Sequence, residues 1–324
     1  MGKILKVFLA VMLPASLMAG GTTGGDILKT ITSGRAAGIG GAYAAAGEDS
    51  ESMAYNPAGL SYITTREFSI SHEWAAADLQ VEKAAYAQPL DTAFIEGNVG
   101  LYGVYRHIPV ISNPDATDSA ISYYDMLIKA CYASNLGKLN LTDWALAKQL
   151  SIGASACMVI EQMAGDNVSY NGSSLSLDLG AQYELAPGVK LGAAINNLGL
   201  NITYNNTQGA SPLPLIFRAG ASWSADLDKD NKGTAVAEYI QNIYDYPRFA
   251  VGFEDILLGL VALRVGYNTS LDTRNASYIS AGAGMQVNQP GLFTVILDYT
   301  YRPEFWGGFN TLENTHLLSL QVKI

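Results

Sequence analysis

The sequence predicts an all-β protein, an antiparallel transmembrane β-barrel of about fourteen strands. Fourteen segments between Arg66 and Ile324 alternate apolar and polar residues with a period of two. Their length of about 9 to 12 residues suits a tilted crossing of a bilayer. A soluble β-sandwich shows the same alternation, but apolar faces rich in Tyr, Leu, Val and Ala favour the barrel over the sandwich.

Each strand is predicted from this alternation. In 173–184, for example, Leu177 and Tyr183 point to one face, while Asp178 and Glu184 point to the other. The predicted strands are 66–74, 79–88, 95–107, 121–133, 150–163, 173–184, 189–198, 215–226, 233–243, 247–255, 260–270, 277–288, 292–302 and 315–324.

The connections between these strands alternate in length. Long connections, predicted to face the outside of the cell, occur at 108–120, 199–214 and 303–314. The intervening turns, such as 289–291, are tight. This asymmetry is typical of outer-membrane barrels. The connection 134–149 is an exception, because its sequence predicts a short amphipathic helix at the periplasmic rim.

The start of the chain, residues 1–19, predicts a secretory signal peptide. Lys3 and Lys6 precede an apolar run at 7–18, and Ala19 offers a small residue for cleavage. The run is too short and too poorly flanked for a transmembrane helix. The predicted location is therefore the bacterial outer membrane, with the barrel in contact with outer-membrane lipid.

The charge balance argues against nucleic-acid binding. The chain has 29 acidic and 19 basic residues and a net charge of −10, whereas a nucleic-acid-binding protein is expected to carry a basic patch. The three histidines are scattered along the chain, so we expect no metal or other cofactor and no catalytic triad. The protein is therefore not expected to be an enzyme.

Two cysteines, Cys131 and Cys157, are predicted to face the lumen from consecutive strands. An oxidising compartment permits a disulfide between them. Two free buried thiols are the simpler alternative, because a disulfide needs a geometry that the alternation does not specify. Both alternatives stay open from the sequence.

A stretch rich in Gly and Ala, residues 33–63, precedes the strands. Its small residues permit close packing against surrounding walls. The acidic run 48–51 is placed to begin a short helix that ends at Tyr55, and Asn56 and Pro57 then predict a turn. A flexible periplasmic tail is the alternative, but a tail is expected to be more polar.

This stretch resembles the N-terminal signature of the long-chain fatty-acid transporter (FadL-like) superfamily, and most closely its PorV/PorQ branch. The resemblance rests on Ser33-x-Arg35-Ala36-Ala37-Gly38-x-Gly40-Gly41-Ala42-Tyr43, followed by Asp49 and by Asn56-Pro57-Ala58-Gly59-Leu60. Segments similar to the barrel of that branch follow in order, with the sequences DLGAQYELAPGVKLGAAINNLG, LRVGYN, ISAGAGMQV and LDYTY.

The resemblance implies a barrel at 66–324 with the segment 20–65 folded into its lumen as a hatch. In this family, hydrophobic ligands pass the hatch region and leave laterally through an opening in the wall at a distorted strand. Such a route is physically reasonable, because each buried CH₂ group favours the bilayer over water by about 0.8 kcal/mol. The implied hatch turn is Asn56, Pro57 and Ala58, and the further hatch residues are Arg35, Gly38, Gly40, Gly41 and Asp49.

Two functions follow from the resemblance. The first is hatch-gated passage of small hydrophobic molecules such as fatty acids. The alternative is a binding or assembly component of a protein-secretion (type IX) apparatus, with proteins of that apparatus as partners. Apolar residues in the outer connections serve either function, and Phe305, Trp306 and Phe309 are the predicted ligand mouth.

Charges of both signs fall on the predicted lumenal face. Mixed signs predict a mutually neutralising ladder that ties the hatch to the wall. The alternative is recognition of a ligand carboxylate by an arginine. The charged residues are Arg106, Lys129, Arg218, Arg264 and Arg302, together with Asp125, Glu161, Asp178 and Asp298.

Overall fold

The computed structural model of the chain describes residues 23–30, 33–75, 78–92, 96–111, 121–138, 145–165, 168–205, 209–272, 277–306 and 310–324. The predicted signal peptide, 1–19, lies outside these residues. No helix within the described ranges is long and apolar enough to cross a bilayer.

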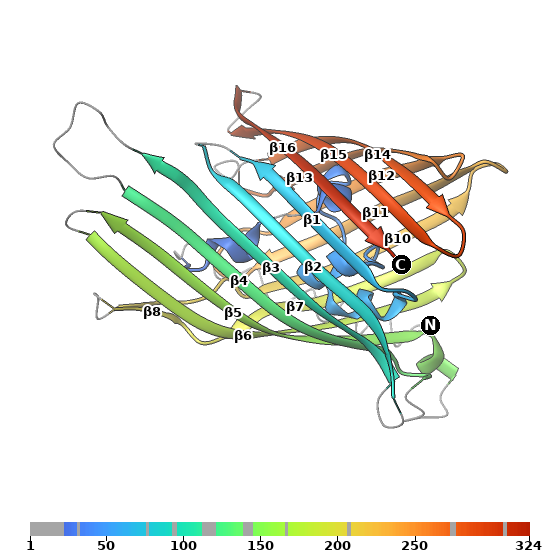
Figure 1. Cartoon of the computed structure of the whole chain (residues 1–324), viewed down its shortest axis with the longest axis horizontal. Helices are drawn as coiled ribbons and strands as arrows, with labels where there is room; N and C mark the ends of the chain where they lie inside the picture. Colours follow the sequence, from blue (N-terminus) through green and yellow to red (C-terminus); the bar gives the residue numbers. More distant parts are fainter. Residues whose placement is uncertain are drawn as a thin grey trace.

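Fourteen strands close an antiparallel barrel (Figure 1). They are β1 (Glu67–Trp74), β2 (Gln80–Asp91), β3 (Glu96–Ile111), β4 (Ile121–Asn135), β5 (Leu150–Gly165), β6 (Val168–Ala186), β7 (Val189–Gly199), β10 (Ile216–Asp226), β11 (Asn231–Asn242), β12 (Arg248–Leu257), β13 (Val261–Ser270), β14 (Ser277–Gln289), β15 (Phe293–Trp306) and β16 (Asn310–Lys323). The first and last strands, β1 and β16, pair with each other and complete the ring. Two short strands, β8 (Ile202–Tyr204) and β9 (Ala210–Ser211), extend the sheet from β6.

Each predicted strand coincides with one of these fourteen, which confirms the predicted fold class. Several strands are longer than predicted, because antiparallel pairing continues beyond the apolar alternation. For example, β3 reaches Ile111 and β15 reaches Trp306. The long connections at 108–120 and 303–314 are therefore shorter than predicted, and 199–214 contains β8 and β9.

The connection in which an amphipathic helix is predicted, 134–149, is described only at its two ends. Strand β4 continues to Asn135, and the short 3-10 helix η5 (Ala145–Gln149) precedes β5. Residues 139–144 lie outside the described part of the chain. We call the end of the barrel with this connection and the tight turns the turn end, and we call the opposite end the outer end.

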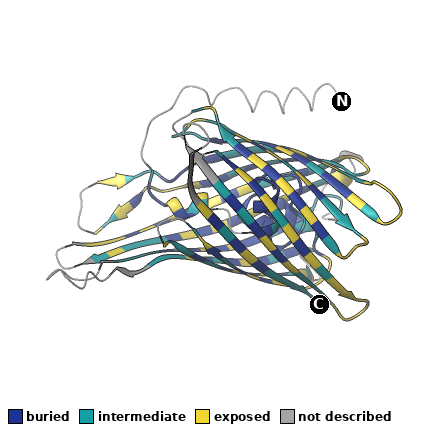
Figure 2. Cartoon of the chain, turned by 90° about the horizontal axis from the view of Figure 1, so that it is seen from above, coloured by how far each residue is buried: buried dark blue, intermediate teal, exposed yellow. Residues whose placement is uncertain are grey.

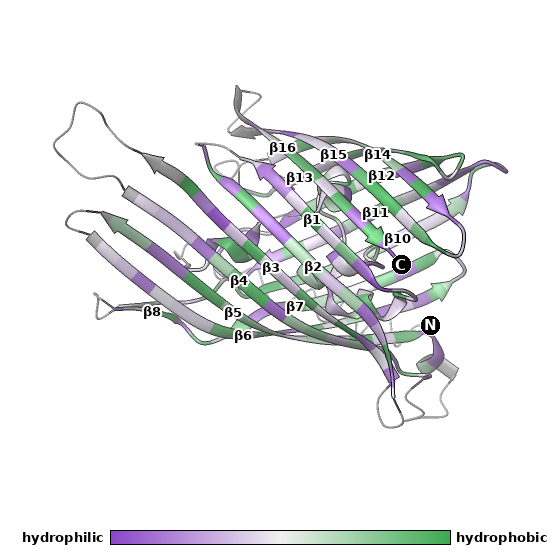
Figure 3. Cartoon of the chain, in the orientation of Figure 1, coloured by the Kyte–Doolittle hydropathy of each residue, from purple (hydrophilic) through white to green (hydrophobic). Residues whose placement is uncertain are grey.

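Burial alternates along the strands, as Figure 2 shows. In β1, Phe68 and Ile70 are exposed on the outer wall, whereas Glu67 and Ser69 are buried inside the barrel. Figure 3 shows apolar and polar residues alternating along the same strands. The outer wall is therefore apolar and the interior polar, which is the arrangement of a barrel that faces lipid.

The neighbouring residues Leu320 and Gln321 test this assignment of faces. Leu320 lies opposite Ile70 and Leu297 on the outer wall, whereas the Gln321 amide donates to the Glu67 carboxylate at 3.1 Å inside the barrel. We expect Leu320→Arg to destabilise the protein in lipid by about 2–4 kcal/mol and Gln321→Arg to insert normally. Chemical unfolding in vesicles and heat-modifiable gel mobility compare the two variants. Equal insertion of both would contradict the assignment.

Residues 33–63 lie inside the barrel (Figure 1), and we call them the inner segment. The inner segment contains the short helices α2 (Gly34–Gly38), η3 (Ser50–Ala54) and η4 (Pro57–Tyr62). Ser33, Asp49 and Asn56 cap these helices, because each side chain accepts a backbone N–H from the first turn. The chain therefore turns sharply several times within the lumen.

Candidate functional site

The wall of the barrel meets the backbone or a side chain of the inner segment at a ring of glycines. At each of these positions a Cβ atom would overlap an atom of the inner segment, so glycine is the residue that leaves room. The positions are distributed around the lumen, and the inner segment is therefore in close contact with several sides of the wall. We call them the glycine ring, which consists of Gly100 on β3, Gly153 on β5, Gly180 on β6, Gly192 on β7, Gly252 on β12 and Gly266 on β13.

The predicted turn residues Asn56, Pro57 and Ala58 are buried within this contact. The Asn56 amide donates to the carbonyl of Ala44 at 2.7 Å and to the carbonyl of Ala181 on β6 at 3.0 Å. Its side-chain oxygen accepts the N–H of Ala58 at 3.1 Å. One side chain thus joins two parts of the inner segment to the wall.

The predicted glycines Gly38, Gly40 and Gly41 lie at the end of α2. Gly40 and Gly41 have φ angles of 73° and 79°, in the left-handed region that favours glycine. The Gly40 carbonyl accepts hydrogen bonds from the Asn268 amide and the Tyr278 hydroxyl, each at 2.9 Å. The sharp turn after α2 is therefore hydrogen-bonded to β13 and β14.

Arg35 extends from α2 to the wall. Its Nε and one terminal nitrogen donate to the Glu254 carboxylate on β12 at 3.0 and 2.9 Å, and the guanidinium also donates to the Tyr43 hydroxyl at 3.3 Å. Tyr43 in turn donates to Asp49 at 2.6 Å. On the wall, Arg264 donates to the same Glu254 carboxylate at 2.6 Å. A chain of charged groups therefore links the inner segment to β12 and β13.

The surroundings favour these hydrogen bonds. Burial lowers the pKa of Arg35, but the Glu254 carboxylate and other neighbours raise it by more, so the pKa lies well above its ordinary value. Burial raises the pKa of Tyr43 well above its ordinary value. Arg35 is therefore always cationic, and the Tyr43 hydroxyl keeps the proton that it donates to Asp49.

The lumenal charges that the sequence predicts are largely paired, which confirms a neutralising ladder. The basic residues pair with acidic residues on other strands of the wall, and three more pairs join the wall to the inner segment. Glu161 instead accepts the backbone N–H of Gly25. The wall pairs are Arg106–Asp125, Lys129–Asp178, Arg218–Glu238, Arg264–Asp298 and Arg302–Glu73, and the pairs with the inner segment are Arg35–Glu254, Lys83–Glu51 and Lys190–Glu48.

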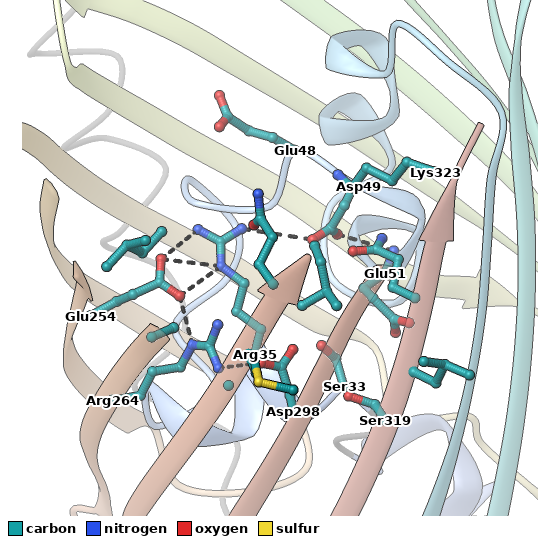
Figure 4. A pocket seen from close by; sticks show the side chains of 18 of the residues that line it. Ser33, Arg35, Glu48, Asp49, Glu51, Glu254, Arg264, Asp298, Ser319 and Lys323 are labelled. Carbon is teal, nitrogen blue, oxygen red and sulfur yellow. Dashed lines mark hydrogen bonds and ion pairs between the residues drawn. The ribbon is translucent and has the colours of Figure 1, made fainter. Parts of the chain in front are cut away.

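Two cavities lie between the inner segment and the wall at the turn end, and we call them the lower cavities. The first has a volume of about 340 Å³, and Arg35, Glu254 and Lys323 are among its lining residues (Figure 4). The second has a volume of about 310 Å³, and Tyr62 and Lys190 are among its lining residues. Arg35 and Glu254 line both cavities. Both cavities are rich in charged side chains.

A third cavity, of about 540 Å³, opens at the outer end, and we call it the mouth cavity. Tyr123, Met163, Tyr170 and Tyr204 line it, together with Glu161. The Tyr204 hydroxyl donates to the Glu161 carboxylate, so this polar pair is satisfied without a ligand. The remaining surface is mainly aromatic and apolar.

The residues of the predicted ligand mouth are not among the described residues that line the mouth cavity. Phe309 and the side chains of Phe305 and Trp306 lie outside the described residues, so their role stays a prediction. Sequence reasoning missed Tyr123 and Tyr204. The available signal was the alternation, which places Tyr123 on the same face as the lumenal charges, but tyrosines are common on both faces of this barrel.

The wall between β6 and β7 is irregular. Their register shifts between Leu177 and Leu179, and Asn197 has a φ of 65°, which is uncommon for residues other than glycine. Asp178, at the shift, accepts the backbone N–H of Asn197 at 2.8 Å. The amide of Asn196 is buried without a hydrogen-bond partner in the described part of the chain. This place is the candidate for the distorted strand that the family resemblance implies.

Cys131 and Cys157 are free and buried. Cys131 lies opposite Ser155 and Cys157 lies opposite Lys129, so the two thiols are diagonal neighbours. Diagonal positions are about 7–8 Å apart, whereas the Cβ atoms of a disulfide are about 3.5–4.5 Å apart. Within the described ranges, no group of three or more His, Cys, Asp and Glu residues is placed to hold a metal ion.

The fold and the filled lumen define an antiparallel barrel that is plugged by its own N-terminal segment. No protein-family model and no curated protein matches the sequence. Solved structures match its fold. The CymD monoaromatic hydrocarbon channel has a TM-score of 0.57 at 12% identity, over 89% of this chain and 96% of that chain.

Two further structures share the fold. The toluene transporter TbuX of Ralstonia pickettii has a TM-score of 0.55 at 13% identity, over 91% of this chain and 98% of that chain. A FadL homologue of Pseudomonas aeruginosa has a TM-score of 0.54 at 12% identity, over 90% of this chain and 98% of that chain. At such low identity the likeness establishes the fold, which is that of FadL-type barrels.

Proposed function

We propose that the protein is an outer-membrane channel for small hydrophobic molecules, which enter through the mouth cavity. The observation that carries this proposal is an aromatic cavity of about 540 Å³ at the outer end of a barrel whose lumen holds the inner segment. Two structures of the same fold are a monoaromatic hydrocarbon channel and a toluene transporter, which supports this class of cargo.

The charges near the mouth cavity favour uncharged molecules over fatty-acid anions. Glu161 places a carboxylate in the cavity lining. The charge of the nearby Arg106 is paired with Asp125, and no Arg or Lys is among the described residues that line the cavity. A ligand carboxylate therefore meets like charge without a guanidinium to neutralise it. Toluene-like molecules avoid this cost.

The exit route is part of the proposal. The lower cavities are lined by charged residues, so an apolar molecule gains little by entering them. The irregular wall between β6 and β7 lies beside the inner segment, and a molecule that leaves there enters the bilayer, where each buried CH₂ contributes about 0.8 kcal/mol. The inner segment acts as the hatch that directs cargo to this wall.

Replacing two apolar side chains of the mouth cavity tests the proposal. Met163→Ser/Tyr170→Ser removes contacts worth about 1.5 kcal/mol each if cargo covers them. Uptake of radiolabelled toluene at low concentration should then fall on the order of a hundredfold. The assay uses cells that express the protein and lack other toluene channels, with decanoate as the anionic probe.

The control variant is Tyr204→Phe, which keeps the ring in the mouth cavity and removes the hydroxyl bonded to Glu161. Its uptake should stay within a few-fold of the unmodified protein, because the apolar area is preserved. Toluene uptake no greater than that of cells without the protein would refute the channel. Uptake of decanoate alone would refute the preference for uncharged cargo. The secretion role remains a prediction from the sequence resemblance.

A further inference from the structure

The two lower cavities share lining residues, and Arg35 is one of them. Figure 4 shows this side chain reaching from the inner segment toward Glu254. The Arg35 side chain is 25% exposed and that of Glu254 is 1% exposed. Both partners line the cavities, but the Arg35 side chain is the more exposed of the two.

On the wall side of the ion pair, the Glu254 carboxylate is held by a second arginine. Arg264 donates to Glu254 and to Asp298, both at 2.6 Å, so the carboxylate keeps its position whether or not Arg35 is bound. On the other side, Arg35 is held by the Tyr43 hydroxyl and lies 3.7 Å from the Asp49 carboxylate. The side chain that can swing is therefore Arg35, which moves with a short helix of the inner segment.

We propose that Arg35 is a latch that closes a polar passage for water and small ions at the turn end of the barrel. While Arg35 is bound to Glu254, it divides the lower cavities and ties α2 to β12. When it is released, the two cavities join into one water-filled space along the wall from β7 to β16, and the inner segment loosens. This passage differs from the apolar route and does not depend on the cargo of the mouth cavity.

The lining of the lower cavities supplies a matched control for the latch. Lys232 also lines both cavities, and no ion pair of Lys232 occurs among the described residues. Removing the charge of Lys232 changes the cavity lining but breaks no ion pair between the described residues of the inner segment and the wall. Arg35→Lys is the conservative variant, because it keeps the charge but loses the two-pronged contact with Glu254.

The experiment compares Arg35→Met, Arg35→Lys and Lys232→Met in planar bilayers, as full chains reconstituted from folded protein. Conductance is recorded together with the rate at which a charged methanethiosulfonate labels Cys131. This thiol lies 4.0 Å from the Pro57 carbonyl of the inner segment and reports its loosening. Because charge-assisted pairs hold the latch, the fraction of time spent open and the labelling rate should rise on the order of tenfold in Arg35→Met.

In Arg35→Lys the open fraction and the labelling rate should rise by an intermediate amount. In Lys232→Met both should equal those of the unmodified protein. If Arg35→Met fails to assemble, the Arg35→Lys result decides. If a folded Arg35 variant shows the same conductance and the same labelling rate of Cys131 as the unmodified protein, the latch proposal is wrong. An equal rise in Lys232→Met would also overturn it, because the effect would then follow from the cavity charge and not from the bond to Glu254.

Discussion

Gly153→Val/Gly266→Val should expel the inner segment from its seat while the barrel stays closed. The new side chains would overlap the backbone at Pro57, Ala58 and Gly40, and overpacking costs about 1–3 kcal/mol at each site. The two glycines lie on β5 and β13, far apart around the ring, so the costs should add. Trypsin cleavage after Arg35 should then rise on the order of a hundredfold.

The matched control is Gly103→Val on β3. A Cβ at Gly103 has no neighbour closer than 3.9 Å, so the substitution adds a side chain to a strand without touching the inner segment. Cleavage after Arg35 should remain at the level of the unmodified protein. Protection of Arg35 in a folded Gly153→Val/Gly266→Val variant would contradict the seating of the inner segment on the glycine ring.

Lys129→Met should be the most destabilising single substitution on the wall of the lumen. Lys129 pairs with Asp178 at 2.7 Å, and both are buried. Removing the lysine leaves the Asp178 carboxylate charged and without its cation, which costs about 3–5 kcal/mol. Chemical unfolding in detergent micelles, followed by tryptophan fluorescence, measures the loss.

The double variant Lys129→Met/Asp178→Asn separates this charge effect from lost packing. The asparagine oxygen can still accept the N–H of Asn197, and no uncompensated charge is left. Most of the stability should return. Lys138→Met, at an exposed pair with Glu96, should change stability by less than about 1 kcal/mol. A double variant no more stable than Lys129→Met would rule out the charge effect.

Most of the barrel is predictable from sequence, because apolar and polar residues alternate with a period of two in every predicted strand. The pairing of β16 with β1 follows from the same pattern, with Phe68 opposite Val322 and Ile70 opposite Leu320. Strand ends at the outer end are less predictable. There the strands continue to Ile111 and Trp306 without a regular apolar–polar alternation, since backbone pairing does not require one.

The candidate site is predictable only in part. The turn at Asn56 follows from local chemistry, because Asn and Pro specify it within a few residues. The mouth cavity depends on residues far apart in sequence, such as Tyr123 and Tyr204, and no local pattern brings them together. The partners of Arg35 are equally distant, since Glu254 lies 219 positions further along the chain.

The pairing of the first strand with the last also sets the timing of assembly. The ring cannot be completed until the final strand has been made, and the early residue Gly40 must wait for Tyr278, 238 positions later. Contacts this distant in sequence form slowly, because chain entropy must be lost before they contribute stability. We therefore expect insertion of the first residues into the lumen and closure of the seam to occur together, late in folding.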